Sequence, residues 1–359
     1  MTLSSDFKDK LSEKVQSCWM SPSNIALVKY WGKKEYQIPA NPSLSFTLSE
    51  AYTITRISAE LNKKGNGPEV SFIFEGEANH HFGTKVELFL KDLSPYLEYL
   101  PFVSLTIESG NNFPHSAGIA SSASGMSALA LSLVCIEQQL LINKLEDDEF
   151  FRKASFIARI GSGSACRSIY SGFSIWGEHP EFENSSDKYA VPIVFKPGNL
   201  FESIRDTILI VNHKPKKVSS RAGHQLMTGH PYAKARYDQA FSNLAKLKRS
   251  MIDNDWDSFV TVVENEALSL HAMMMTSNPG FVLMDPDTLK IIELIGFFRK
   301  EHKMKICFTL DAGPNVHLLY PAEEQEKVDS ILDELKKYCF QGKFISDYMG
   351  TGPVNKHCK

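Results

Sequence analysis

The spacing of apolar residues changes repeatedly along this chain, and no other feature limits its fold as strongly. Residues 43–58 alternate apolar and polar side chains with a period of two, which is typical of strands, and residues 71–75 and 102–108 repeat the pattern. Between these last two, residues 84–97 place apolar side chains at helical spacing. Strand and helix patterns are therefore mixed along the chain, which predicts the α+β or α/β class.

Residues 121–142 form the clearest predicted helix, because Met126, Leu129 and Leu133 fall on one of its faces. A second helix over about 146–159 begins with four acidic residues, which suit the positive end of a helix dipole. The same patterns predict further helices over about 233–252, 255–272, 286–301 and 322–339, and further strands over 168–176, 207–212, 305–310, 316–320 and 344–346.

Length and composition indicate two domains. The chain has 359 residues, 43% of them hydrophobic and 23% charged, which is typical of a globular protein. Domains usually contain roughly 100–200 residues. A segment rich in charge and proline over 177–204 separates two structured halves. We therefore predict an N-terminal domain over 1–195 and a C-terminal domain over 196–359.

Charge and cysteine content argue against several classes of protein. The net charge is −3, so no general basic excess attracts nucleic acid or an anionic membrane. The six cysteines form no C-x-x-C pair, and the sequence contains neither an H-E-x-x-H nor a G-x-S-x-G motif. It has no stretch of about 18 apolar residues and no apolar export signal at its start. We expect a cytoplasmic protein that binds small molecules, not nucleic acid or membranes.

A serine-rich segment over 113–125 precedes the predicted helix. Free N–H groups and small side chains at a helix start allow a phosphate to approach, and serine hydroxyls can bind phosphate or magnesium. The alternative interpretation is an ordinary N-cap with tight packing. The segment matches neither the Walker A motif nor the dinucleotide-binding fingerprint.

Three other segments carry groups suited to chemistry. Residues 159–168 combine hydroxyls, glycines and Arg167, which could hold a carboxylate or phosphate, or could form a solvated turn. Asp311 ends an apolar strand before a Gly-Pro turn, where it is either a base or a turn former. Lys29 and Lys33 flank the end of an apolar run and are either site cations or ordinary surface lysines.

Five segments, taken in this order, resemble the diphosphomevalonate decarboxylases of the GHMP small-molecule kinases, and the resemblance covers about residues 21–353. They are 24–33 (NIALVKYWGK), 113–125 (FPHSAGIASSASG), 161–168 (GSGSACRS), 219–223 (SSRAG) and 310–315 (LDAGPN). The resemblance implies the α+β GHMP kinase fold, with an N-terminal α/β domain like ribosomal protein S5 domain 2, a ferredoxin-like C-terminal domain and an active site between them.

The implied reaction is ATP-dependent decarboxylation of (R)-5-diphosphomevalonate to isopentenyl diphosphate, with release of ADP, phosphate and carbon dioxide. Magnesium would accompany ATP, and the protein would be a homodimer. Asp311 would orient or remove the proton of the C3 hydroxyl with Lys29 nearby, and Arg167 would hold the substrate carboxylate. These three are the implied catalytic residues.

The resemblance also implies two sets of binding residues. The substrate would contact Asn24, Tyr30, Trp31, Gly32, Lys33, Lys85, Ser162, Gly163, Ser164, Ala165, Cys166, Arg167, Arg221 and Ala312. ATP would contact Pro114, Gly118, Ser121, Ser122, Ala123, Ser124, Gly125 and Ser220, and Ser122 would also serve as a magnesium ligand. One departure from the family is His224, which follows Gly223 where methionine is common.

Two alternatives stay open at this point. A related GHMP enzyme could act on mevalonate or its 5-phosphate, as a kinase or a monophosphate decarboxylase. A catalytically idle GHMP-fold binding protein is the second alternative. The joint presence of Lys29 and Asp311 favours decarboxylation, and Tyr30, Lys33 and Arg221 favour a substrate with a diphosphate.

Overall fold

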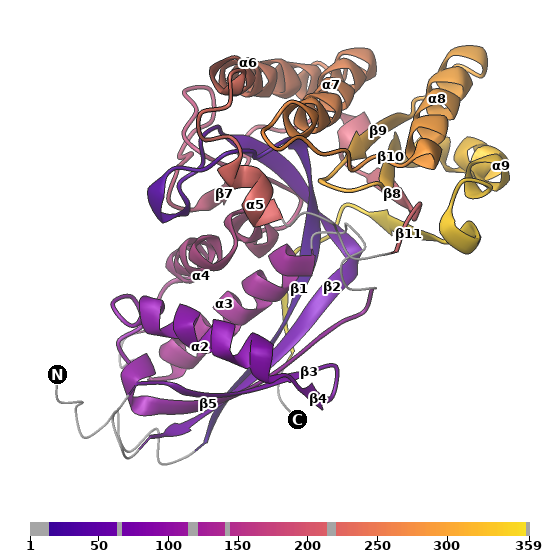
Figure 1. The fold of residues 1–359 in the computed structure, drawn as a ribbon. Coiled ribbons are helices and arrows are strands. Elements are labelled where there is room, and N and C mark those ends of the chain that lie inside the picture. The colour runs from indigo at the N-terminus through magenta and orange to yellow at the C-terminus, as the bar shows by residue number, and fades with distance from the viewer. Residues whose placement is uncertain (1–13, 63–66, 114–120, 141–143, 214–219, 357–359) are drawn as a thin grey trace.

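A computed structural model of the protein describes residues 14–62, 67–113, 121–140, 144–213 and 220–356. Within these ranges the chain forms two β-sheets, each covered by helices (Figure 1). We call the larger sheet with α2, α3 and α4 the N-terminal lobe, and the smaller sheet with α6 to α9 the C-terminal lobe. None of the helices described is long and apolar enough to cross a membrane.

The N-terminal lobe is built on two long antiparallel strands, β1 (Val15–Val28) and β2 (Ser43–Leu61). The main path of its sheet runs β12-β1-β2-β5-β3-β4, while β6 pairs with β2 and β7 pairs with β6. The remaining strands are β3 (Glu69–Phe74), β4 (Glu77–Ala78), β5 (Val103–Asn111), β6 (Phe173–Trp176), β7 (Ala190–Pro192) and β12 (Val354–Asn355). The long strands extend from this lobe toward the other one (Figure 1).

Three helices cover one face of this sheet: α2 (His80–Leu93), α3 (Ser121–Leu140) and α4 (Asp147–Gly161). The central helix α3 packs on β1 and β2. Its apolar positions Leu129, Leu133 and Ile136 are buried in the core, as their spacing predicts. This packing fixes the serine-rich start of α3 at the edge of the lobe.

The C-terminal lobe has four antiparallel strands in the order β11-β8-β10-β9, and the short helix α5 (Ser220–Gln225) follows β8 in the chain. In chain order this arrangement is fourth, first, third, second, which is the ferredoxin-like topology that the resemblance implies. The strands are β8 (Ile204–Leu209), β9 (Cys307–Leu310), β10 (Val316–Pro321) and β11 (Phe344–Tyr348), and the helices are α6 (Ala233–Ile252), α7 (Trp256–Met275), α8 (Pro286–Glu301) and α9 (Gln325–Lys336).

The lobes share a hydrophobic core. One cluster of buried residues contains Phe46 of β2 together with Ile208 of β8, Leu244 of α6 and Phe259 of α7. After the C-terminal lobe the chain returns to the N-terminal lobe, where β12 pairs with β1. Apolar burial of this kind resists separation of the two lobes.

Most predicted elements are confirmed, but the strand predicted over 168–176 is wrong in its first half. Residues Gly163–Ile169 form a 3₁₀-helix, and only Phe173–Trp176 pair as a strand. One tertiary and one local feature explain the difference: the hydroxyl of Ser168 accepts a hydrogen bond from Asn24, and Gly172 adopts a positive φ of 58°. Both turn the backbone away from an extended path.

Candidate active site

A cavity of about 680 Å³ lies between the two lobes. It is lined by residues from the end of β1, the start of α3, the last turn of α5 (His224), the 3₁₀-helix after α4, and the turn after β9. Four of the five segments that carry the family resemblance therefore meet in one place. The predicted residues that line it are Asn24, Lys29, Tyr30, Trp31, Lys33, Lys85, Ser121, Ser122, Gly125, Ser162, Gly163, Ser164, Arg167, Asp311 and Ala312.

Lys29 and Asp311 form an ion pair across the cavity. The Lys29 Nζ lies 3.7 Å from the Asp311 Oδ1, and the two side chains are 2% and 26% exposed. Lys29 follows the end of β1 and Asp311 follows the end of β9, so each lobe supplies one member. Burial lowers the pKa of Lys29, while the charges of Asp311 and Glu266 act to raise it.

Arg167 is held in the cavity wall by two serines of β2. Its Nε donates to the Ser45 hydroxyl at 2.9 Å, and its Nη1 donates to the Ser43 hydroxyl at 2.6 Å. The guanidinium also lies over the Trp176 ring at 5.9 Å. Burial lowers the pKa of Arg167, yet an arginine side chain stays charged at neutral pH. The result is a fixed cation suited to a carboxylate.

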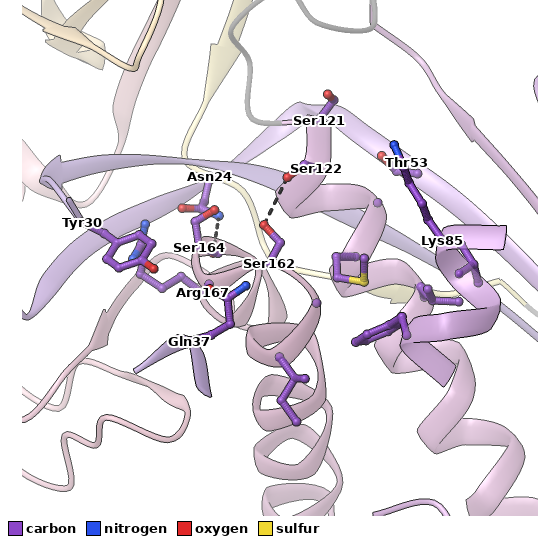
Figure 2. Close-up of a pocket in the computed structure, with 18 of the residues that line it drawn as sticks. Asn24, Tyr30, Gln37, Thr53, Lys85, Ser121, Ser122, Ser162, Ser164 and Arg167 are labelled. Atoms are coloured by element: carbon purple, nitrogen blue, oxygen red, sulfur yellow. Dashed lines mark hydrogen bonds between the residues drawn. The ribbon is translucent and has the colours of Figure 1, made fainter. Parts of the chain in front are cut away.

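The 3₁₀-helix after α4 joins two of the predicted motifs (Figure 2). The Ser162 hydroxyl lies 3.1 Å from that of Ser122 at the start of α3, and the Asn24 amide donates to the Ser164 carbonyl at 3.2 Å. A Cβ on Gly163 would lie only 2.7 Å from the Trp176 ring. Only glycine therefore fits between the serines that face the cavity.

The start of α3 presents Ser121, Ser122 and Gly125 to the cavity. Ala123 is buried in the core of the lobe, and the Ser124 hydroxyl lies 2.7 Å from that of Thr53, so these two predicted residues do not line the cavity. The 20-residue helix directs its positive end at the site. Two further predicted ATP contacts, Pro114 and Gly118, lie outside the described residues.

His224 of α5 contacts the loop that follows β1. The rings of Tyr30 and Trp31 lie 4.2 and 4.6 Å from the His224 ring, and the Gly32 N–H donates to the His224 Nδ1 at 3.0 Å. Burial lowers the pKa of His224 to about 3, so the ring is neutral and can accept this bond. A Cβ on Gly32, whose φ is 90°, would lie 2.2 Å from the Tyr237 hydroxyl oxygen.

Besides Gly32, Ala123 and Ser124, which do not line the cavity, four predicted substrate or ATP contacts are not placed there by their side chains. Ala165 packs in the core of the N-terminal lobe. The Cys166 thiol donates to the Gly163 carbonyl, and burial raises its pKa to about 12. Ser220 and Arg221 begin α5, whose residue His224 lines the cavity, but their side chains are outside the part of the chain that the structure describes.

Sequence reasoning missed an aromatic end of the cavity. Phe72 and Phe74 of β3 stack on Phe82 of α2 with centroids 6.2 and 6.1 Å apart, and the Lys85 Nζ lies 5.8 Å from the centre of the Phe82 ring. The two-residue spacing of Phe72 and Phe74 places them on one face of a strand, which was the available signal. This end is suited to a flat apolar ring.

The donor groups of the cavity fit a magnesium ion held mainly by phosphates. Among the side chains described, His, Cys, Asp and Glu form no group of three that could hold a metal. Magnesium is often bound through substrate phosphates with few protein ligands. The Ser122 hydroxyl, adjacent to that of Ser162, supplies oxygen at the positive end of α3.

Comparisons with known proteins agree with this geometry. Residues 21–190 match the family model of the diphosphomevalonate decarboxylase-like N-terminal domain, and residues 207–357 match that of the mevalonate 5-diphosphate decarboxylase C-terminal domain. The diphosphomevalonate decarboxylase of Ganoderma lucidum is 32% identical over 93% of this chain and 85% of its own. That of Candida albicans is 31% identical over 87% of this chain and 86% of its own.

Solved structures show the same architecture. The mevalonate diphosphate decarboxylase from Staphylococcus aureus superposes with a TM-score of 0.82 at 30% identity, over 97% of this chain and all of that one. A structure of MDDEF in complex with MVAPP, AMPPCP and magnesium superposes with a TM-score of 0.81 at 27% identity, over 96% and 99% of the two chains. The fold is therefore the α+β GHMP kinase fold, and the chain belongs to the diphosphomevalonate decarboxylase family.

Proposed function

We propose that this protein catalyses the ATP-dependent decarboxylation of (R)-5-diphosphomevalonate to isopentenyl diphosphate, with release of ADP, phosphate and carbon dioxide. The observation that carries the proposal is the Lys29–Asp311 pair, whose members come from different lobes and face one cavity. Family membership and a related structure that holds MVAPP with an ATP analogue and magnesium support it.

The first chemical task is to activate a tertiary alcohol. The Asp311 carboxylate accepts the proton of the C3 hydroxyl as its oxygen attacks the γ-phosphorus of ATP, which typically contributes about 10²–10⁴-fold to the rate. Lys29, 3.7 Å away, offsets the negative charge that develops on the transferred phosphoryl group. Both groups lie in a largely buried position, where electrostatic interactions are strong.

The second task is to release carbon dioxide. Phosphate leaves C3 with the electrons of the C–O bond, and the electrons of the carboxylate C–C bond then form the new double bond. Arg167, fixed by Ser43 and Ser45, binds the substrate carboxylate and aligns the breaking bond. Ser162, Ser164 and Asn24 line the cavity beside it and complete the proposed carboxylate site.

The phosphate groups have separate proposed positions. The triphosphate of ATP lies at the start of α3, with magnesium bound to phosphate oxygens and the Ser122 hydroxyl, where it offsets phosphate charge. The substrate diphosphate lies near Tyr30 and Lys33, with Arg221 of α5 and Lys85 as further cations. The aromatic end formed by Phe72, Phe74 and Phe82 is suited to the adenine ring.

The proposal also includes a domain boundary, an oligomeric state, a location and a class of partners. A domain boundary near residues 195 and 196 is supported by β7, which ends at Pro192 in the first sheet, and by β8, which begins at Ile204 in the second. A homodimer stays a prediction from the family resemblance, and a cytoplasmic location stays a prediction from the cysteine pattern and composition. The partners proposed are small molecules only.

The decisive experiment measures ADP and carbon dioxide release with mevalonate, its 5-phosphate and its 5-diphosphate. We expect both products in equal amounts with the 5-diphosphate alone. ADP without carbon dioxide would identify a kinase, turnover of the monophosphate would identify a different decarboxylase, and no substrate-dependent ADP would identify an idle binding protein.

The first prediction concerns Asp311→Asn, which keeps the side-chain volume but cannot accept a proton. The variant is expected to lose about 10²–10⁴-fold in kcat and to bind ATP and diphosphomevalonate as the wild type does. Steady-state kinetics and equilibrium binding measure the two effects. Asp238→Asn, at an exposed residue of α6, is the matched control, and wild-type turnover in Asp311→Asn would contradict the assigned base.

A further inference from the structure

Helix α7 of the C-terminal lobe contacts the backbone of both members of the ion pair. The Glu266 Oε2 accepts a hydrogen bond from the Lys29 N–H at 2.9 Å, and the His271 Nε2 donates to the Asp311 carbonyl oxygen at 3.0 Å. Both α7 side chains are fully buried. A single helix therefore holds one residue from each lobe.

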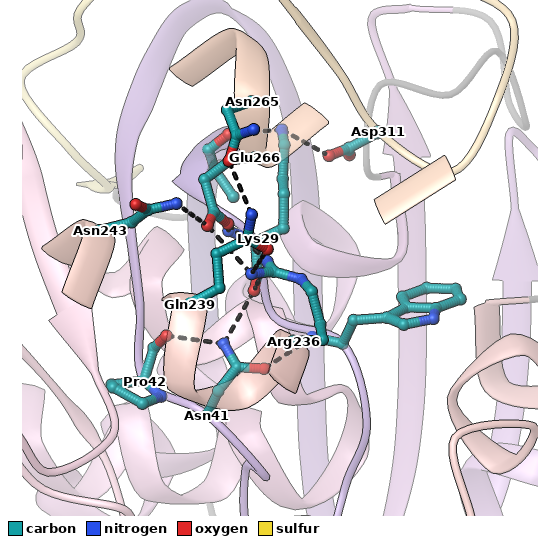
Figure 3. Close-up of polar contacts among 11 residues, drawn as sticks. Lys29, Asn41, Pro42, Arg236, Gln239, Asn243, Asn265, Glu266 and Asp311 are labelled. Atoms are coloured by element: carbon teal, nitrogen blue, oxygen red, sulfur yellow. Dashed lines mark hydrogen bonds and ion pairs between the residues drawn. The ribbon is translucent and has the colours of Figure 1, made fainter. Parts of the chain in front are cut away.

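Glu266 is itself fixed by α6. The Arg236 Nη2 lies 2.5 Å from the Glu266 Oε2, and the Asn243 amide donates to the Glu266 Oε1 at 2.7 Å (Figure 3). The Lys29 carbonyl oxygen accepts a hydrogen bond from the Asn41 amide at 2.9 Å. The backbone of Lys29 is thus held at its N–H by Glu266 of the C-terminal lobe and at its carbonyl oxygen by Asn41 of the N-terminal lobe.

Glu266 and His271 belong to the same uninterrupted helix. Glu266 and His271 are five residues apart within one regular helix, and an α-helix rises 1.5 Å per residue. These hydrogen bonds fix the backbones of Lys29 and Asp311 and leave both charged side chains available for the reaction. A buried ion pair such as Arg236–Glu266 contributes little net stability compared with apolar residues of the same volume, so stability alone does not explain it.

We propose that α7 sets the separation between Lys29 and Asp311, with Glu266 and His271 as positioning residues for the two groups. This inference rests on the proposed function, because it assigns the pair a role in phosphoryl transfer. A displacement of about 1 Å at a reacting group can lower the rate by about 10²-fold. Loss of either backbone contact is therefore expected to reduce kcat and to leave substrate binding intact.

The first test replaces His271. His271→Phe keeps the ring shape and removes the N–H donor, and we expect kcat to fall at least tenfold with KM for both substrates unchanged. His271→Gln restores a donor and should recover much of kcat. The matched control is His179→Phe, because the His179 Nε2 bonds the Phe241 carbonyl in the same way at 3.1 Å, and neither residue lines the cavity.

Wild-type kcat in His271→Phe, or an equal loss in His179→Phe, would overturn the proposal. Urea unfolding of each variant separates a loss of positioning from a loss of fold. The proposed function is tested in the same assay by the wild type: no substrate-dependent product would refute the function, whereas an active wild type with an active His271→Phe refutes only the positioning role.

The second test uses the pH profile of Glu266→Gln. The charged groups that influence Lys29 are Asp311, Glu266, Arg167 and Arg236. Removal of the Glu266 charge lowers the pKa of Lys29, so the fall in kcat at alkaline pH should begin at a lower pH. Glu266→Gln keeps an acceptor for the Lys29 N–H and removes only the charge, so an alkaline fall that stays at the wild-type pH would show that Glu266 does not act on Lys29 and would overturn its assignment.

Discussion

At the scale of single residues, burial of charge determines what the cavity can do. Lys29 and Arg167 are almost fully buried, and each has specific polar partners within the protein. Removing a charge from water is costly, so such groups persist where they have fixed partners. The same partners hold the cations in place before any ligand binds, which is the condition for electrostatic catalysis.

A prediction at this scale concerns the titration of Lys29. Burial lowers the pKa of Lys29, so activity should fall as the pH rises, with a midpoint below the ordinary lysine value of 10.5. Lys29→Arg keeps a positive charge at all accessible pH values and should lose this alkaline fall, although its kcat will be lower. Profiles of kcat against pH for both proteins check the prediction, and identical alkaline limbs would contradict it.

A second prediction concerns Lys33, which lines the cavity next to Tyr30 and donates to Gln37 at 3.0 Å. Lys33→Ala should raise KM for diphosphomevalonate about tenfold, because a charged hydrogen bond contributes about 1.5–3 kcal/mol, and should leave KM for ATP unchanged. The neighbouring Lys34 is exposed and outside the cavity lining, so Lys34→Ala is the control. Equal KM values in both variants would mean that Lys33 does not contact the diphosphate.

At the scale of elements, short segments carry the site while long ones position it. The start of α3, the 3₁₀-helix Gly163–Ile169 and α5 all contribute to the cavity. Each is held by a contact that sequence spacing does not reveal, such as Gly163 against Trp176. The long strands β1 and β2 fix these segments relative to one another, because α3 packs across both.

The prediction at this scale concerns the attachment of α5. His224→Met removes the acceptor of the Gly32 N–H and should raise KM for diphosphomevalonate about 2- to 10-fold, which corresponds to one hydrogen bond. KM for ATP should not change. His213→Met, a histidine outside the cavity that packs on Phe340, is the control. An unchanged KM would show that substrate binding does not depend on the hydrogen bond between Gly32 and His224.

At the scale of the whole molecule, the Asp347 carboxylate is one of the groups that link the two lobes. Asp347 of β11 accepts hydrogen bonds from the backbone N–H groups of Ser49, Glu50 and Ala51 at 2.8, 2.9 and 2.8 Å. These residues belong to the middle of β2, where its pairing passes from β5 to β6. This irregularly paired stretch of β2 is therefore held by the C-terminal lobe.

The corresponding prediction is a loss of stability in Asp347→Asn. Asparagine retains one acceptor oxygen and turns an amide toward one backbone N–H, which costs about 1–3 kcal/mol of unfolding free energy. Urea unfolding at neutral pH measures the effect. Asp333→Asn, with a side chain that is 94% exposed, should change stability by less than about 0.5 kcal/mol. Equal stabilities in the two variants would contradict the role of Asp347.

Local patterns in the sequence predicted most helices and strands and the segments that line the cavity. Apolar periodicity is a local property, so α3, β2 and β8 to β11 were predictable within a few residues, whereas the long strand β1 was not predicted. The strand predicted from Ser168 failed because a tertiary hydrogen bond to Asn24 outweighed local preference. The two-residue strand β12 gave no signal, since it is too short for a period to be visible.

The sequence by itself determined the class of the fold, the residue types of the site and the family they resemble. Only the tertiary structure decided that Lys29 and Asp311 lie 3.7 Å apart and that Glu266 and His271 hold them. The physical reason is that backbone preferences act over a few residues, whereas distances between remote residues follow from how whole elements pack. In this protein, that packing is set by the core shared between the lobes and by α7 within it.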